Sequence, residues 1–435
     1  MQKDKKTKIY KICTIILFMI YIVGVLEVTL ARGAFYGSEK VALFDSYKEA
    51  WYFATWPLWR NIILNMVLFM PFGVLLPMVS GKMQKFRRIC LTGFLFSFCV
   101  ESAQYLFSRG IFEGADLLNN TLGAMIGYGI YILGQQIILL FQRKNGSVKK
   151  VLLAQVPLFA VILTGGLLYF IYQIQEYGNL EQSYCSAKDM SGIQVKTDQK
   201  YKTQVEKVDI YRTKVYSAKE TEKLAKSIFK QFGAVLDERR TLRFDDSAFY
   251  WGKISDTSPD NQVSLEIDYR GGTYRAGRIS EQMEEKSDDR NEISKEEAIS
   301  ALTALQIQIP EYGEYSYNQE TKNAQFYIPP KEGKTKQICG TLTGGDFRKG
   351  TFGHIYNQLV EVETYKSVSA ISEQDAYEKI KSGQFFGKIS GVNEIVAGKV
   401  KLEYRIDSKG FYRPVYVFAV KIDGEMSTIE IPADQ

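Results

Sequence analysis

The sequence predicts a membrane all-α bundle of five transmembrane helices, N-terminus inside and C-terminus outside, followed by an extracytoplasmic α+β domain. Three observations predict this fold. Five long apolar stretches lie within residues 9–172, basic residues gather in alternate loops between them, and strand-like segments alternate with short amphipathic helices further on. The expected domains are a membrane part at 1–175, a stalk or linker at 176–207, and an extracellular part at 208–435.

Charge is distributed unevenly along the chain. Residues 1–175 hold 18 Lys and Arg against 8 Asp and Glu, whereas the remainder holds 37 against 41. Five cysteines without a CxxC spacing exclude a disulfide scaffold or a Cys-rich zinc module. The single histidine, His354, excludes His-dependent triads and multi-His metal sites within one chain. We therefore expect no metal, no cofactor and no nucleic-acid partner.

A helix that spans a membrane needs about 20 mostly apolar residues. Five stretches meet this requirement, and they run roughly over Ile9–Ala31, Asn61–Val79, Ile89–Phe107, Leu117–Phe141 and Val151–Tyr172. The first could also be a signal peptide, because basic residues precede an apolar run. Its length, its internal Glu27 and the lack of a clean small-x-small cleavage site favour a retained span.

Charged residues in the loops predict the orientation. Basic residues precede the first span and fill the loops at 82–88 and 143–150, whereas the alternate loops have mixed charge, with Glu39, Asp45, Glu49, Glu113 and Asp116. By the positive-inside rule the N-terminus is cytoplasmic, and five spans leave the C-terminal domain outside the cell.

Aromatic residues crowd the loop before the second span, where Trp51, Tyr52, Phe53, Trp56 and Trp59 lie close together. Indole and phenol rings favour the headgroup layer, so this segment is expected on the outer membrane surface. A plain aromatic-rich connector remains an equal alternative.

Polar residues inside the spans form the candidate site, because they are costly in a bilayer and gather at one depth in its outer half. The predicted ligand-binding residues are Asn61, Asn65, Glu101, Gln104, Arg109, Asp116 and Asn120. They could instead tie the helices together, but two carboxylates and several amides exceed what packing requires. Gly123 and Gly127 form a small-xxx-small pattern that lets another helix approach closely.

The same residues carry a resemblance. Asn61 and Asn65 lead into Pro71-Phe72-Gly73, Glu101 and Gln104 have an E-x-x-Q spacing, and Asp116 is followed by Asn120-Thr121-Leu122-Gly123. This ordered pattern, over about residues 10–140, resembles the VanZ-like family of bacterial membrane proteins, with Asn120 rather than Asn119 as the family asparagine. The resemblance implies a role in the cell envelope, which in the namesake is low-level resistance to the glycopeptide teicoplanin. It supplies no mechanism.

The second half shows signs of a repeat. Ser217, Ser294 and Ser372 each begin a capping box before a short amphipathic helix, and the three serines are nearly evenly spaced. Alternating segments such as Val263–Tyr269 and Val400–Ile406 predict strands between them. We expect an α+β domain of two or three modules, which weakly resembles PepSY-like ectodomains. Whether Cys185 and Cys339 pair is left open.

No catalytic signature is evident in either half, so a non-enzymatic function is favoured. The membrane bundle would bind an amphiphile or lipid-linked envelope component at the outer leaflet, and the ectodomain would bind a protein partner. In that reading Glu101 and Asp116 accept hydrogen bonds, Arg109 contacts an anion, and the amides orient the ligand. Two alternatives stay open: an acid/base enzyme or transporter using Glu101 and Asp116, and a membrane-anchored signalling protein.

Overall fold

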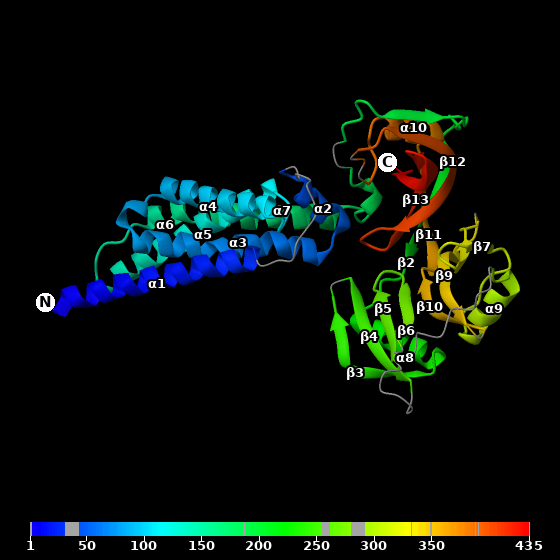
Figure 1. Cartoon of the computed structure of the whole chain (residues 1–435), viewed down its shortest axis with the longest axis horizontal. Coiled ribbons are helices and arrows are strands. Elements are labelled where there is room, and N and C mark those ends of the chain that lie inside the picture. The colour runs from blue at the N-terminus through cyan, green and yellow to red at the C-terminus, as the bar shows by residue number, and fades with distance from the viewer. Residues whose placement is uncertain are drawn as a thin grey trace. The chain divides into compact units, whose positions relative to one another are not determined.

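The computed structural model describes residues 2–30, 43–185, 188–244, 246–254, 262–279, 292–331, 333–348, 350–387, 389 and 391–434. The chain divides into two compact units, Met1–Glu176 and Tyr177–Gln435 (Figure 1). The first is helical and the second is built around a sheet, so each is considered by itself.

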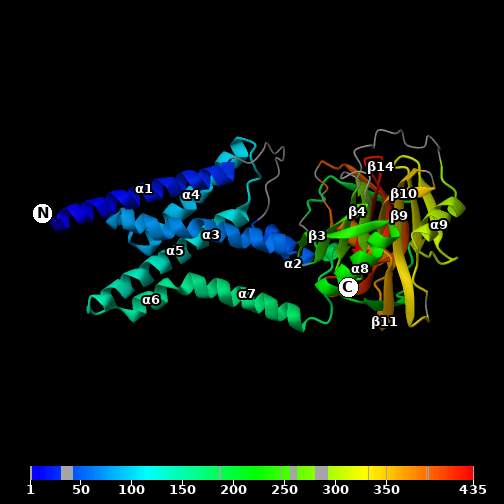
Figure 2. The same ribbon diagram turned by 90° about the horizontal axis from the view of Figure 1, so that it is seen from below.

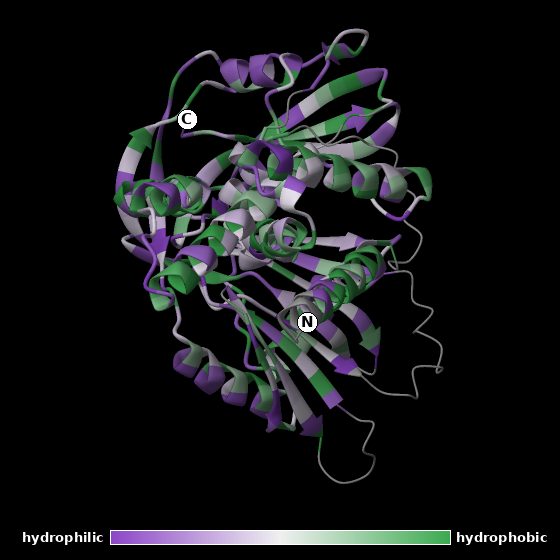
Figure 3. Cartoon of the chain, turned by 90° about the vertical axis from the view of Figure 1, so that its left-hand side faces the viewer, coloured by the Kyte–Doolittle hydropathy of each residue, from purple (hydrophilic) through white to green (hydrophobic). Residues whose placement is uncertain are grey.

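Five helices of the first unit are long and apolar enough to cross a membrane, within the described residues. They are α1 (Gln2–Leu30), α3 (Trp56–Val79), α4 (Phe86–Leu106), α5 (Gly114–Phe141) and α7 (Val156–Ile174). Large apolar side chains on their outer faces are exposed, as a lipid-facing surface requires. Figure 3 shows hydrophobic residues along these helices and mixed residues along the strands. The expectation of five apolar helices followed by a sheet-rich domain is confirmed.

Helix ends differ from the expected ones where proline intervenes. The second span begins at Trp56 rather than Asn61, because Pro57 lies in its first turn, where the missing N–H costs no hydrogen bond. The expected span from Val151 is divided into α6 (Val148–Ala154) and α7, with Pro157 in the first turn of α7. The predicted end of the first span, Ala31, and the loop residue Glu39 lie outside the described residues.

Glycines bring α3 and α5 into close contact. A Cβ atom added at Gly123 would lie 2.1 Å from the Met66 carbonyl oxygen, and one at Gly127 would lie 1.9 Å from that of Met70. A Cβ atom added at Gly73 on α3 would likewise lie 1.9 Å from the Ala124 carbonyl oxygen on α5. Helix α1 packs against α3 and α4, and helix α4 packs against α5, which runs obliquely to α1 (Figure 2). Gly134 faces open space instead.

The second unit is a mixed sheet with the order β1-β12-β13-β2-β11-β9-β10-β6-β5-β4-β3, in which β14 pairs with β13 and the β7–β8 hairpin joins β9. The strands are β1 (Gln194–Thr197), β2 (Lys207–Thr213), β3 (Ala234–Arg243), β4 (Ser247–Ile254), β5 (Gln262–Asp268), β6 (Tyr274–Ile279), β7 (Glu314–Asn318), β8 (Asn323–Ile328), β9 (Lys336–Arg348), β10 (Thr351–Asn357), β11 (Val360–Ser369), β12 (Glu394–Ile406), β13 (Phe411–Ile422) and β14 (Glu425–Pro432). The β1–β12 pair is parallel, and the other named pairs are antiparallel.

Three helices begin at the predicted serines. Ser217, Ser294 and Ser372 cap α8 (Ala218–Gln231), α9 (Lys295–Ala304) and α10 (Glu373–Lys381), and each cap is a complete capping box. Antiparallel strands follow each helix: β3–β6 after α8, β7–β10 after α9, and β12–β14 after α10. The predicted helix starts are therefore confirmed, whereas the repeat itself stays a prediction.

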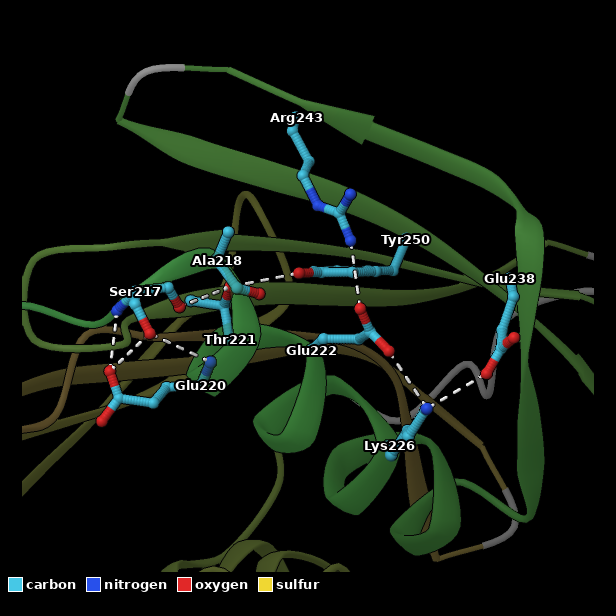
Figure 4. A network of polar contacts seen from close by, with 9 residues as sticks. All are labelled: Ser217, Ala218, Glu220, Thr221, Glu222, Lys226, Glu238, Arg243 and Tyr250. Carbon is cyan, nitrogen blue, oxygen red and sulfur yellow. Dashed lines mark hydrogen bonds and ion pairs between the residues drawn. The ribbon is translucent and has the colours of Figure 1, made fainter.

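Polar contacts fix α8 on its strands (Figure 4). The Thr221 hydroxyl lies 3.1 Å from the Tyr250 hydroxyl, and Arg243 on β3 donates to Glu222 at 3.0 Å. Lys226 reaches both Glu222 and Glu238 at 3.1 Å. Beneath this layer, Phe229 and Ile228 join a core with the inward residues of β4 and β5.

The segment expected to be a stalk belongs to the sheet unit. The Gly178 N–H donates to Asp407 Oδ2 at 2.7 Å, the Asn179 N–H donates to Ser408 Oγ at 2.7 Å, and β1 pairs with β12. The Tyr201 ring is buried and its hydroxyl donates to the Gly398 carbonyl at 2.7 Å. Partners more than 190 residues away in the chain, rather than local periodicity, fold this polar segment onto the sheet.

Candidate functional site

Polar side chains gather at one end of the membrane unit, where α3 begins, α4 ends and α5 begins. Five of them are buried: Ser97, Glu101, Gln104, Asn119 and Asn120. Helical spacing explains the arrangement, because Ser97, Glu101 and Gln104 recur on one face of α4, while Asp116 and Asn120 lie one turn apart on α5.

A first group of hydrogen bonds joins α3, α5 and the short helix α2 (Asp45–Phe53). Asn65 Nδ2 donates to Asp116 Oδ1, and the Tyr47 hydroxyl donates to Asn119 Oδ1 at 2.6 Å. Burial, followed by the negative charge of Asp116, raises the pKa of Tyr47 to about 12. Tyr47 therefore keeps its proton at neutral pH and acts as the donor to Asn119.

A second group joins α1, α4 and α5. Asn120 Nδ2 donates to Ser97 Oγ at 2.9 Å, and the backbone N–H of Glu113 donates to Glu101 Oε2 at 3.3 Å. Gln104 Nε2 donates to the Thr29 carbonyl near the end of α1 at 3.0 Å. The structure thus divides the predicted site between two sets of partners that share α5.

Two buried polar atoms of this cluster have no hydrogen-bond partner among the described residues. They are Asn119 Nδ2 and Asn120 Oδ1, on side chains that are 1% and 5% exposed. A buried polar atom without a partner costs about 1–3 kcal/mol, and the bilayer interior offers no bulk water to satisfy it. One donor and one acceptor are therefore available beside the two hydrogen-bonded groups.

Two predicted site residues are exposed rather than buried. The Asn61 side chain is exposed near the start of α3, one turn before Asn65. The Arg109 side chain is exposed in the loop between α4 and α5, and its backbone N–H donates to the Gln104 carbonyl at 2.8 Å. The structure brings together Asn65, Glu101, Gln104, Asp116 and Asn120 from the predicted set.

Sequence reasoning missed Asn119 and Tyr47. Asn119 follows Asp116 by three residues, so helical spacing could have placed it beside that carboxylate. No sequence signal could have identified Tyr47, because it lies 72 residues from Asn119 in an aromatic-rich loop.

In the described part of the sheet unit, Asp407 and the Arg413–Asp434 ion pair are buried and bind the Gly178 backbone. His354 is exposed on β10, and Cys185 and Cys339 are both free thiols. Burial raises the pKa of Cys339 to about 12, so its thiol stays protonated and unreactive. In the described residues of both units, no group of three or more His, Cys, Asp or Glu side chains could hold a metal ion.

Solved structures show weak likenesses to this chain. An uncharacterized protein from Eubacterium rectale is 12% identical with a TM-score of 0.29, covering 58% of this chain and 90% of that one. The Bacillus megaterium YpeB C-terminal domain is 15% identical with a TM-score of 0.26, covering 51% and 95%. TM-scores below 0.5 establish no common fold.

Family comparison identifies the membrane part. No curated protein matches the chain. The VanZ/LLP1 family model matches residues 11–139, which run from α1 to the end of α5 and include every polar residue of the buried groups. This match over residues 11–139 confirms the VanZ-like resemblance that the sequence motifs predicted.

Proposed function

We propose that the membrane unit binds the polar headgroup of an amphiphile or lipid-linked envelope component in its outer half. The observation that carries the proposal is the pair of unpartnered atoms, Asn119 Nδ2 and Asn120 Oδ1, buried beside Glu101 and Asp116. A headgroup carrying both a donor and an acceptor, such as a hydroxyl or an amide, satisfies both atoms. The VanZ-like match supports a membrane protein of the cell envelope.

Each polar residue has a role in this proposal. Asn119 and Asn120 contact the ligand, Ser97 and Tyr47 orient them, and Asp116 holds Asn65. Glu101 accepts a ligand donor while anchoring the first turn of α5. The exposed Arg109 and Asn61 would meet the ligand only outside the buried groups.

The outer location depends on the proposed orientation, with a cytoplasmic N-terminus and an extracellular sheet unit. It is supported by the basic loops at 82–88 and 143–150. Single cysteines at Gln84 and Gly146, in a chain lacking native cysteines, should resist an impermeant thiol reagent in intact cells. One at the exposed Met426 should react. Labelling at Gln84 would reverse the orientation.

The binding test replaces the amides by leucine. If Asn119 and Asn120 only pack, Asn120→Leu should be neutral or stabilising, because it removes an unsatisfied buried atom. If they bind a ligand, Asn119→Leu and Asn120→Leu should lower the amount of co-purifying amphiphile at least tenfold at unchanged membrane abundance. Mass spectrometry of lipids extracted from the purified protein measures this amount.

The matched control is Gln155→Leu. Gln155 is a buried amide between α6 and α7, and its Nε2 donates to the Gly129 carbonyl of α5 at 2.8 Å. Its loss should lower stability without changing the bound lipid. Unchanged lipid in both asparagine variants would refute the proposal.

The same variants also test a role in resistance. The susceptibility of cells to teicoplanin is measured for each variant beside its abundance in the membrane.

A second candidate function is regulatory, with the sheet unit sensing a partner. It is favoured by the short connection between the units, because α7 ends at Ile174 and Gly178 is already hydrogen-bonded to Asp407. Arg413 reinforces this junction, since it pairs with Asp434 at 2.6 Å and donates to the Gly178 carbonyl. Truncation after Glu176 distinguishes the two: retained lipid binding with loss of the envelope phenotype favours regulation.

A further inference from the structure

Helix α2 and the residue Leu43 just before it contact the start of α5 at three places. The Tyr47 hydroxyl donates to Asn119, and Ser46 Oγ donates to Glu113 Oε2 at 3.1 Å. Just before α2, the Leu43 Cα atom lies 3.2 Å from the position that a Cβ atom on Gly114 would occupy. These contacts place α2 directly against the turns of α5 that carry Asp116 and Asn119.

The position of α2 closes the first polar group. Asn119 is 1% exposed although its Nδ2 atom has no partner among the described residues, and α2 supplies the Tyr47 hydroxyl on its other atom. Asn119 lies one helical turn after Asp116 on α5, so its contact with Tyr47 is next to the Asn65–Asp116 pair. A ligand that reaches Asn119 from the side of α2 must therefore displace Tyr47.

Polar contacts attach the first turn of α2 to α5, through Ser46 and Tyr47. Ala50 is the fully buried side chain of this nine-residue helix. The helix ends at Ala54, whose φ of 50° and ψ of 31° lie in the left-handed region that costs a non-glycine residue free energy. A ligand hydroxyl or amide can replace the Tyr47 hydroxyl as a hydrogen-bond partner of Asn119.

The aromatic residues of α2 suit a position at the membrane surface, whether or not the helix is packed against α5. Trp51, Tyr52 and Phe53 are half-buried, and Phe44 just before the helix is 59% exposed. The Trp51 ring contacts Tyr172 of α7 edge-on, with centroids 6.2 Å apart. Aromatic rings of this kind remain favourable in the headgroup layer when the helix shifts sideways.

We propose that α2 is a lid over the ligand site, with Tyr47 as its latch. In the closed state described here, the Tyr47 hydroxyl occupies Asn119, and in the open state a ligand group takes its place. Tyr47 is thus a positioning residue, and the lid controls entry from the lipid side. This inference rests on the proposed function, yet lid opening is measurable without any ligand.

The first test measures access to Ser97, which is fully buried and accepts a hydrogen bond from Asn120, the neighbour of Asn119 in the chain. The full chain, with its native cysteines replaced and Ser97→Cys added, is placed in nanodiscs of palmitoyloleoyl phosphatidylglycerol. Labelling by methanethiosulfonate ethylammonium reports opening. Tyr47→Phe should raise the labelling rate about two- to tenfold, the range for loss of one hydrogen bond. Ser46→Ala should act in the same direction.

The matched control is Tyr169→Phe, which removes an exposed hydroxyl from α7 and should leave the rate unchanged. Equal rates in the Tyr47, Ser46 and Tyr169 variants would overturn the lid. Faster labelling with no co-purifying amphiphile would support the lid and refute the binding function, so the two proposals fail separately.

A disulfide between residues 43 and 114 should hold α2 against α5, whereas loss of the Tyr47 hydroxyl should release it. The Leu43 Cβ atom lies 3.5 Å from the Cβ position at Gly114, within the range that a disulfide spans. In a full chain lacking native cysteines, the pair Leu43→Cys and Gly114→Cys should slow hydrogen exchange at the amides of residues 115–120 when oxidised. Reduction should restore the exchange seen with either single cysteine. Identical exchange in the oxidised and reduced forms would contradict the lid.

Discussion

Glu220 makes the capping of α8 dependent on charge. Its carboxylate is held by Lys214 and by the Ser217 backbone and hydroxyl, and these hydrogen bonds, with that of Lys214 the largest, lower its pKa from 4.5 to about 2. Because the folded pKa lies below the ordinary value, the stabilisation is complete above about pH 4.5. It is lost as the pH falls toward 2.

We therefore expect Glu220→Gln to destabilise the fragment Tyr177–Gln435 at about pH 6, with a difference from wild type that shrinks toward zero near pH 2. Urea unfolding followed by the fluorescence of Trp251, the tryptophan of this fragment, measures the difference. Glu425→Gln, an exposed carboxylate on β14, is the control and should show no such trend. A difference that stays constant over this pH range contradicts the prediction.

Single residues also show how far sequence reasoning reached at the site. Glu101, Gln104 and Asn120 could be predicted as site residues from the sequence. Helical spacing puts polar side chains of one helix on a common face, and the free-energy cost of such side chains in a bilayer marks them as functional. Tyr47 could not be predicted, because its contact with Asn119 depends on how a loop folds back onto the bundle. The two unpartnered amide atoms are likewise a property of the packed helices, which no local pattern encodes.

At the level of elements, the closest approach in the membrane unit is that of α3 and α5. A Cβ atom at Gly127 would lie 1.9 Å from a backbone oxygen, which cannot move aside as a flexible side chain could. Gly127→Ala should therefore force the helices apart and destabilise the unit by about 1–3 kcal/mol, as overpacking does. Thermal unfolding of the detergent-purified protein measures the loss.

Gly134→Ala is the control on the same helix, since nothing lies within 4 Å of its added Cβ atom. This variant should be neutral or slightly stabilising, because alanine favours a helix over glycine. Equal losses in the two variants would show that helix propensity, rather than the contact with Met70, decides the effect.

Elements with a strong local signal were predictable from the sequence. Apolar length identified the five long helices, and serine capping boxes located the starts of α8, α9 and α10. Helix α2 and the division between α6 and α7 were not predicted. A nine-residue amphipathic helix has too little apolar length to stand out, and the effect of Pro157 depends on where the helix begins.

For the whole molecule, the main difference from the sequence prediction is the residue at which the second unit begins. Sequence composition separated an apolar half from a polar half correctly, but it could not place residues 177–207, whose partners lie near the opposite end of the chain. Asp407 is fully buried and accepts the N–H groups of Gly178, Lys409 and Phe411. Without Gly178 this carboxylate loses one of these donors, and burial already raises its pKa.

Two fragments test this boundary. Residues 177–435 keep β1, the buried Leu180 and Tyr201, and the junction at Asp407, so we expect a soluble protein with a cooperative unfolding transition. Residues 208–435 lose the strand that covers the edge of β12 and the ring that packs between Tyr377 and Phe418. An uncovered strand edge and an opened core favour aggregation, so this shorter fragment should be insoluble or unfold without a transition. Circular dichroism and size-exclusion chromatography compare the two, and equal stability would show that residues 177–207 contribute nothing to the fold.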